Sequence, residues 1–186
     1  EDAGFDHKII EHKVIVPMKA ECYQIGKAIM QGDCAIVNGK TFMSTDFTKK
    51  RTLMHQLCGG ILTQDGQVQV VCFQKAEWIL QMMYTGKRIA VYHYFQEEGK
   101  LLRRYLSGFY TDDIEEFDRG FKAVFIGQVK KDSCGVRLAS ADALIVYSCD
   151  YSATNYLQWR DRLVFLGRKE VEIYWLFNDQ LSVDQA

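Results

Sequence analysis

Three arginines near the end of the chain could carry chemistry. Arg160 and Arg162 lie within the stretch YSCDYSATNYLQWRDRLVFLGR (147–168), and Arg168 closes it. The stretch begins as a hydrophobic strand and continues as a predicted helix, with Ser152 as the N-cap. Because Arg160 and Arg162 are two positions apart, they point to different faces of that helix and cannot both be buried. Arginines in this place could stabilise the charge of a phosphate group.

The elements that must position these arginines follow a regular order from residue 75 onward. The predicted strands are apolar on both faces and cover 88–95, 122–129, 142–148 and 170–177. Predicted helices alternate with them and cover 75–86, 97–106, 111–120 and 152–165, with a short helical turn at 134–141. This order predicts an α/β fold, a parallel sheet with helices on both faces. Ligands bind such sheets beyond the carboxyl ends of the strands, so the loops at 95–99, 129–135 and 148–153 are expected to share one edge.

The first 74 residues have a more local pattern. A strand is predicted at 12–18, a hairpin with its turn at Asn38-Gly39, and a looser hairpin around Asp65-Gly66. A helix at 19–30 is expected to bury Cys22, Ile25, Gly26 and Ile29, and a helix at 46–58 to bury Phe47, Met54, Leu57 and Cys58 before stopping at Gly59-Gly60. We expect residues 1–74 to form an N-terminal helix/hairpin segment packed on a core lobe of residues 75–186, within a single structural domain.

The composition limits the possible functions. The chain has 186 residues, 48% of them apolar, and one proline, which is typical of a compact globular domain. Its net charge of −1 gives no general attraction to nucleic acid, so DNA contact requires a local patch. Lys130 and Lys131 follow a predicted strand, where a phosphate could be met.

The cysteines and the ends of the chain also carry information. Six cysteines show neither a CxxC pair nor the spacing of metal ligands, so we expect free thiols in a reducing cytoplasm and no metal site. No apolar run is long enough to span a membrane, and no signal peptide is visible. The chain begins at Glu1 and closes with the capping-box pattern Ser182 to Gln185, so both ends are interpreted as cut from a longer protein.

Phosphate loops and common catalytic arrangements are missing from the sequence. It contains no GxxxxGK[ST] loop and no GxGxxG, and Gly59-Gly60 is better explained as a helix stop. The acids Asp112-Asp113 and Glu115-Glu116 are best explained as the start of a short helix, capped by Thr111 or Asp112, because negative charge favours that end of the helix dipole. The arginines could therefore stabilise charge on a phosphate that another lobe holds.

One family matches these motifs. The stretch GVRLASADALIVYSCDYSATNYLQWRDR (135–162), continued by LGRKEVEIYWLF, resembles motifs V and VI of Swi/Snf-type superfamily-two DNA helicases, most closely phage and prophage members. The segment RIAVYHYFQEEGKLLRRYL lies where motif IV falls in that family. The resemblance implies the C-terminal RecA-like lobe of an ATP-driven translocase on double-stranded DNA. A separate N-terminal lobe would carry the Walker A and DExH motifs and would hold most of the ATP and Mg²⁺.

The resemblance also assigns residues. Gln158 and Arg162 match motif VI, with Arg162 reaching the γ-phosphate across the cleft, and Gly135 matches the turn of motif V. Lys130, Lys131 and Arg137 are expected to contact the DNA backbone, although Arg137 stands where the family has asparagine. The isolated chain is expected to be inactive as an ATPase, because an arginine alone does not bind the nucleotide.

Departures from the family pattern leave alternatives open. Phe165 stands where the family has its second arginine, for which Arg160 or Arg168 are the possible substitutes. The small residues of motif V are replaced by Gln128, Val129, Asp132 and Ser133. The chain could instead be a degenerate helicase-like lobe that serves as a DNA- or protein-binding module. A flavodoxin-like enzyme is disfavoured, because no phosphate loop follows the first parallel strand.

Overall fold

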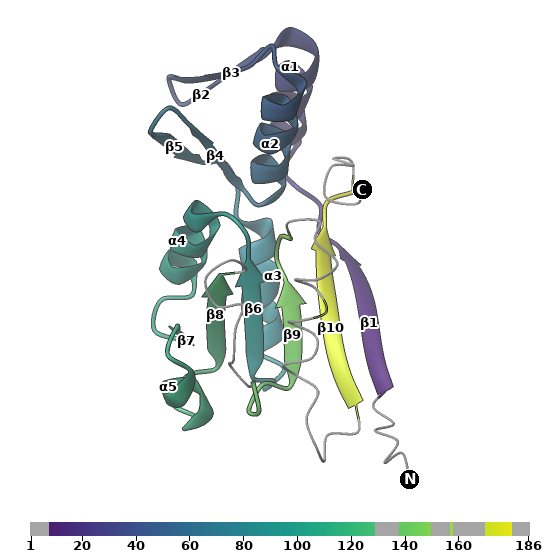
Figure 1. The fold of residues 1–186 in the computed structure, drawn as a ribbon, viewed down its shortest axis with the longest axis vertical. Helices are drawn as coiled ribbons and strands as arrows, with labels where there is room; N and C mark the ends of the chain where they lie inside the picture. Colours follow the sequence, from purple (N-terminus) through teal and green to yellow (C-terminus); the bar gives the residue numbers. More distant parts are fainter. Residues whose placement is uncertain (1–7, 129–137, 150–156, 158–169, 180–186) are drawn as a thin grey trace.

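A six-stranded, fully parallel sheet forms the centre of the molecule (Figure 1). The computed structural model describes residues 8–128, 138–149, 157 and 170–179. The strand order is β1-β10-β9-β6-β8-β7, and every neighbouring pair is parallel. In that order the strands are Lys8–Ile15, Glu170–Phe177, Ala143–Val146, Ile89–His93, Val124–Gln128 and Tyr110–Thr111. The predicted α/β parallel sheet is confirmed.

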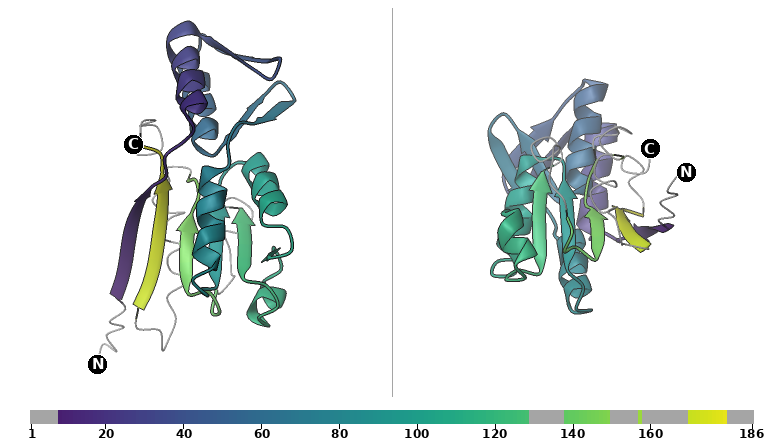
Figure 2. Two further views of the ribbon diagram at one scale, coloured as in Figure 1. Left: turned by 180° about the vertical axis from the view of Figure 1, so that it is seen from behind. Right: turned by 60° about the horizontal axis from the view of Figure 1, so that its bottom comes forward.

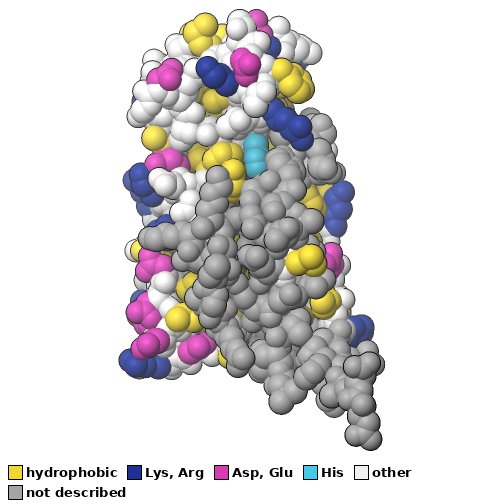
Figure 3. Space-filling view, viewed as in Figure 1, with side chains coloured by type: hydrophobic (Ala, Val, Ile, Leu, Met, Phe, Trp, Pro, Cys, Tyr) yellow, Lys and Arg dark blue, Asp and Glu magenta, His cyan; other side chains and the backbone are white. Residues whose placement is uncertain are grey.

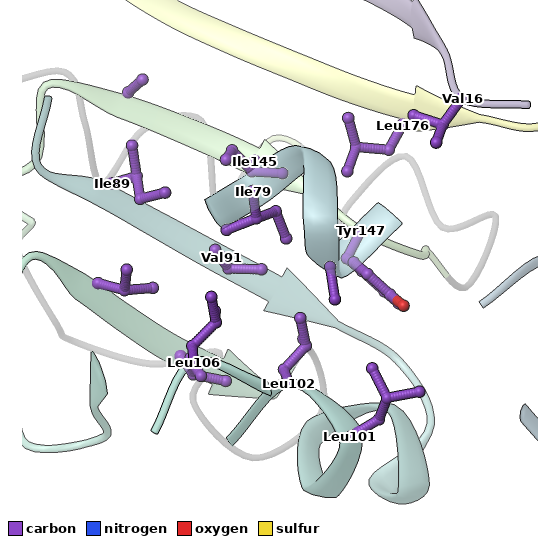
Figure 4. Close-up of a cluster of buried hydrophobic side chains, with 14 of the residues drawn as sticks. Val16, Ile79, Ile89, Val91, Leu101, Leu102, Leu106, Ile145, Tyr147 and Leu176 are labelled. Atoms are coloured by element: carbon purple, nitrogen blue, oxygen red, sulfur yellow. The ribbon is translucent and has the colours of Figure 1, made fainter. Parts of the chain in front are cut away.

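Helices cover both faces of this sheet. The helices α3 (Gln74–Met83) and α4 (Gln96–Tyr105) pack on one face, where Ile79 and Leu102 meet the alternate strand residues Val91 and Ile145 (Figure 4). Seen from behind, α3 runs along this face (Figure 2). The helix α5 (Ile114–Asp118) belongs to the other face, where Phe117 packs in a second apolar cluster. Strands apolar on both faces need such double cover, as the sequence pattern predicted.

The chain changes direction between β6 and β9, which are neighbours in the sheet. After β6 it passes through α4 to the strands on one side, β7 and β8, whereas after β9 it reaches β10 on the other side. The loops that leave these two strand ends therefore diverge, and such a topological switch point is the usual ligand crevice of an open parallel sheet.

A smaller N-terminal module with its own core stands beyond the carboxyl ends of the strands (Figure 1). It contains α1 (Ala20–Gly32), β2 (Cys34–Val37), β3 (Lys40–Met43), α2 (Phe47–Cys58), β4 (Ile61–Gln64) and β5 (Gln67–Val70). The strand β1 precedes this module in sequence but pairs with β10 in the large sheet. The proposed division at residues 74 and 75 remains a prediction.

Several local predictions are confirmed and others are wrong. The predicted inward face of α1 is confirmed, because Cys22, Ile25, Gly26 and Ile29 are its buried residues. Phe47 was expected inside but is 69% exposed, because the core of the small module does not reach the first turn of α2.

Three turn and strand details also differ. Asp113, rather than Thr111 or Asp112, caps α5 and accepts hydrogen bonds from the amides of Glu115 and Glu116. The second hairpin is as tight as the first, because Asp65 and Gly66 both have positive φ. The first strand spans 8–15 instead of 12–18, and the two-residue strand β7 was not predicted.

Candidate functional site

The residues predicted to perform chemistry lie outside the described part of the chain. This applies to Arg160, Arg162 and Arg168, to Gly135 and Gln158, and to Lys130, Lys131 and Arg137. Leu157, in the same predicted helix, is described as helical and exposed. The roles of the eight residues remain predictions, and the described site is the edge of the sheet from which those segments leave.

The three strand ends expected to share one edge do lie together. Hydrogen bonds join the residues just beyond β6, β8 and β9. The Tyr94 amide donates to Ser148 Oγ at 2.9 Å, and Gln128 Nε2 donates to Tyr94 O at 3.3 Å. Because the strands are parallel and in register, their carboxyl ends form one edge. The prediction is confirmed for these strand ends, whereas residues 129–135 and 150–153 of the predicted loops lie outside the described residues.

Glu98, from the first turn of α4, lies at the centre of this edge and is fully buried. Its Oε2 accepts hydrogen bonds from the amides of Tyr94 and Phe95, at 3.2 and 3.0 Å, and from the hydroxyl of Ser148. Its Oε1 has no hydrogen-bond partner. The bond from the Phe95 amide is the N3-carboxylate half of a capping box, and the other half is missing because Phe95 has no side-chain acceptor.

The end of α2 contacts this carboxylate. Gly59 follows α2, and a methyl group on its Cα would lie 1.9 Å from Glu98 Oε1, so any other residue there must displace the carboxylate. Tyr147, at the end of β9, donates its hydroxyl hydrogen to Gly59 O at 2.7 Å. Gly59 is thus the stop of a helix, as predicted, and also the point where the module meets the end of β9 and the first turn of α4.

Burial controls the electrostatics of these groups. Desolvation raises the pKa of Glu98 to about 7, and the hydrogen bond from Ser148 is the largest effect opposing it. The buried Lys75 ammonium donates to Tyr147 O at 3.3 Å and also favours the charged carboxylate. Burial raises the pKa of the Tyr147 hydroxyl well above its ordinary value, and the nearby Glu98 charge adds to this effect. Tyr147 therefore acts as a neutral hydrogen-bond donor.

The space beside this network is too small for a nucleotide. It is a cavity of about 10 Å³ at the ends of β9 and β10, bordered by His55, Cys58, Gly59 and Lys75 on the module side. That volume holds about one water molecule. In the described part of the chain, the switch-point crevice is filled by the protein's own side chains.

Charges on the described surface are mixed. Along the border formed by α4, β7 and α5, basic and acidic groups alternate (Figure 3). Basic side chains have acidic partners, such as Arg103 with Asp112 at 3.6 Å and Lys50 with Asp33. No basic patch that could follow a DNA backbone is visible on the part of this face that the structure describes.

Metal and membrane searches of the described residues are negative. They contain no group of three or more His, Cys, Asp or Glu side chains that could hold a metal ion. No described helix has the length and apolar content needed to cross a membrane. The five described cysteines are free thiols, and Cys22, Cys58 and Cys72 are buried.

The sequence did not single out the residues of this network. Glu98, the pair Tyr147-Ser148 and Lys75 belong to three different segments, and each residue is unremarkable in its own segment. The one available signal was the position of Glu98, three residues after Phe95 at a helix start, which is the capping-box spacing.

Comparisons with known proteins identify the fold. No family model and no curated protein matches the chain. Among solved structures it is similar to the C-terminal part of the Fun30 ATPase domain, with a TM-score of 0.57 and 12% identity over 94% of this chain and 86% of that one.

A second similar structure is the Sulfolobus solfataricus SWI2/SNF2 ATPase core in complex with double-stranded DNA, with a TM-score of 0.62 and 16% identity. That likeness covers 91% of this chain but 41% of the other, so the chain spans less than half of that ATPase core. At these identities the likeness establishes a fold, the RecA-like α/β fold of Swi2/Snf2 ATPase lobes.

Proposed function

We propose that this chain is the C-terminal RecA-like lobe of an ATP-dependent DNA translocase or helicase of the Swi/Snf type. The supporting observation is the likeness to the C-terminal part of the Fun30 ATPase domain, which spans nearly the whole chain. The motif V and VI resemblance of residues 135–162 is an independent argument, because it rests on residue types and not on shape.

This proposal assigns different roles to two lobes, because the described edge has no phosphate-binding loop. The chain has no phosphate-binding loop, and its described crevice is filled by Glu98 and Tyr147. An N-terminal lobe would therefore hold ATP and Mg²⁺, and this lobe would complete the site with Arg162, supported by Gln158 and Gly135. An arginine supplied from outside the nucleotide's own lobe neutralises the charge that develops on the transferred phosphoryl group. It also makes hydrolysis depend on closure of the two lobes.

The DNA part of the proposal rests on weaker support. The similar SWI2/SNF2 ATPase core was solved with double-stranded DNA. In this chain Lys130, Lys131 and Arg137 follow β8, at the carboxyl edge of the sheet, and would contact phosphates there. Phosphate contacts position a protein on DNA without reading its sequence.

The cellular setting is part of the same proposal. Free thiols at all five described cysteines fit a reducing compartment, so we place the protein in the cytoplasm. The motif VI passage suggests phage or prophage relatives, and this assignment has no support beyond the sequence resemblance.

The decisive experiment is Arg162→Ala in the protein that includes its N-terminal lobe. ATP turnover with DNA present should fall by roughly 10³-fold while the fold is kept, which is the scale of an arginine finger. Arg160→Ala and Arg168→Ala test which residue supplies the second arginine role. Arg119→Ala is the matched control, because Arg119 is exposed on α5 and pairs only with nearby Glu115, at 3.4 Å.

Unchanged ATP turnover in the arginine variants would favour a structural role for the helix. If Arg162 merely pairs with an acid such as Asp150, alanine should lower the melting temperature by a few degrees, with little change in turnover. If all three variants turn over ATP at nearly the wild-type rate, the helix is not catalytic. The second function, a degenerate helicase-like lobe that binds DNA or protein, would then be preferred, as Phe165 and the altered motif V already favour.

A further inference from the structure

Two strand ends and the N-terminal module meet at a single buried carboxylate. We propose that Glu98 is a positioning residue, which fixes the point where the chain leaves β9 towards the predicted arginine helix and ties that point to the module. The link to ATP hydrolysis rests on the proposed function, whereas the positioning itself concerns this chain alone.

The first part of the argument is the geometry at the strand ends. Tyr94 N lies 2.9 Å from Ser148 Oγ and 3.2 Å from Glu98 Oε2, and the Ser148 hydroxyl donates to the same carboxylate oxygen. The three groups form a closed triangle across the switch point. Ser148 stands four residues before Ser152, the predicted start of the arginine helix. Ser148 is therefore the described polar residue closest in sequence to the predicted start of that helix.

The second part is the contact with the module. Glu98 Oε1 lies against Gly59, and the adjacent strand end holds the same glycine through the hydrogen bond from Tyr147 to Gly59 O. A displacement of α2 relative to the sheet must therefore move Glu98, Tyr147 or both. The module has a core cluster of its own, and Ile61 of β4 also packs into the core of the large sheet, so the two parts are joined at this edge.

A simple capping role does not account for these contacts. A helix cap requires only the bond between Glu98 and the Phe95 amide. Capping needs neither full burial, nor the bond from Ser148, nor a glycine fitted to the second carboxylate oxygen. The buried, unpartnered Oε1 is costly to keep, which argues for a role beyond helix capping.

Hydrogen–deuterium exchange on the whole chain tests the positioning. In Glu98→Ala, amide exchange at 94–95 and 147–149 should accelerate by about tenfold or more, with the centres of β6 and β9 unchanged. Glu98→Gln should restore protection, because its amide oxygen accepts the same hydrogen bonds. Gly59→Ala should reproduce the Glu98→Ala pattern, since its methyl group displaces the carboxylate.

Two matched controls accompany these variants. Glu97→Ala removes the neighbouring acid, which pairs with Lys100 at 2.7 Å. Gly32→Ala adds a methyl group at a helix end with nothing within 4 Å. If faster exchange in Glu98→Ala is confined to the start of α4, Glu98 is only a helix cap and the proposal is overturned. The proposal is also overturned if Gly59→Ala changes amide exchange no more than Gly32→Ala does. If Glu98→Ala does not fold, Ser148→Ala takes its place, and unchanged exchange at 147–149 in that variant would overturn the proposal.

Kinetics with the N-terminal lobe present test the link to hydrolysis. Glu98→Ala should lower kcat about tenfold or more with the KM for ATP within about twofold, because a misplaced arginine weakens the transition state more than ground-state binding. Glu98→Gln should restore kcat. Unchanged kcat in Glu98→Ala would overturn this link. A wild-type protein without any ATPase would count against the proposed function, and the exchange pattern alone would then decide the role of Glu98.

Discussion

At the scale of single residues, the burial of Glu98 dominates the electrostatics at the carboxyl ends of the strands. Three donors stabilise its charge through one oxygen, and Lys75 adds a favourable charge, yet full burial dominates. The folded-state pKa therefore rises from an ordinary value of 4.5 to about 7. A carboxyl group with a raised pKa is more easily accommodated when protonated, so this residue links the stability of the edge to pH.

This linkage gives a prediction with a defined sign. The stabilising contribution of protonated Glu98 should be complete below about pH 4.5 and should be lost as the pH rises to about 7, a change of about 3 kcal/mol. Glu98→Gln cannot titrate, so it should equal the wild type at about pH 3.5 and exceed it by up to about 3 kcal/mol at about pH 8. Urea unfolding of both proteins across this range measures the difference.

Comparing the two proteins isolates Glu98 from its titratable neighbours. Lys75 and Tyr147 face it from α3 and β9, His93 lies beside the first turn of α4, and Cys72 lies close to Tyr147. All four residues are present in both proteins, so the substitution removes only the Glu98 carboxyl group. Parallel stability curves for the two proteins would show that Glu98 does not titrate in this range.

At the scale of elements, the passage from α2 to β4 decides how the module closes on itself. Gly60 has a φ of +85°, and its carbonyl accepts hydrogen bonds from the amides of Val71 and Cys72. A methyl group on Gly60 would lie 2.2 Å from Cys72 O, which is a backbone atom and cannot turn aside. Two constraints, a left-handed backbone and a close approach, therefore act on one residue.

A matched pair of glycines separates these constraints. Gly66 has a similar φ of +76°, with nothing within 4 Å of an added methyl group. Gly66→Ala should therefore cost about 1 kcal/mol, the strain of the left-handed backbone alone. Gly60→Ala should cost about 3 kcal/mol or more, because the backbone clash is added. Denaturant unfolding measures both values, and equal costs would mean that the chain around Cys72 can shift.

At the scale of the whole molecule, the proposed function requires this fold to supply one half of a nucleotide site. The parallel sheet, its switch point and its diverging loops suit a lobe that meets a ligand at its carboxyl edge. In the described residues, the cavity beside Glu98 and Tyr147 is about the size of one water molecule, and a larger hollow of about 760 Å³ lies between β5 and α4. The proposed function assigns this lobe a contribution to a shared site.

The isolated chain should accordingly show no ATPase activity above background. It should bind ATP no more tightly than roughly millimolar, which corresponds to about −4 kcal/mol, because it lacks a phosphate-binding loop. Calorimetric titration with Mg·ATP and a phosphate-release assay measure these quantities. Clear turnover by the isolated chain would refute the two-lobe interpretation.

DNA binding by the isolated chain should be weak and strongly dependent on salt. The net charge is −1, so affinity must come from a few side chains, chiefly Lys130 and Lys131 with Arg137. Affinity should fall steeply between about 50 and 200 mM salt, with little preference for sequence. Fluorescence anisotropy with two unrelated duplexes measures both properties. Affinity that ignores salt, or that differs strongly between the duplexes, would contradict the proposed backbone contacts.

Hydrophobic alternation and the residue types in turns allowed several elements of this protein to be predicted from the sequence. The strand β10 is found at the predicted residues 170–177, and the turn Asn38-Gly39 has positive φ at both positions. These features depend on neighbours in the chain, so local patterns predict them. The parallel sheet followed from the same reasoning, because strands apolar on both faces require helices on both sides.

Only the tertiary structure decided which polar groups meet at the carboxyl edge. Glu98, Gly59 and Ser148 are separated by 39 and 50 positions along the chain, and neither hydrophobic period nor propensity relates residues so far apart. The same limit explains the errors, since the exposure of Phe47 depends on where a small core ends and not on its helical position. Burial and packing of distant segments determine whether a carboxylate is a solvated helix cap or a buried group that contacts several segments.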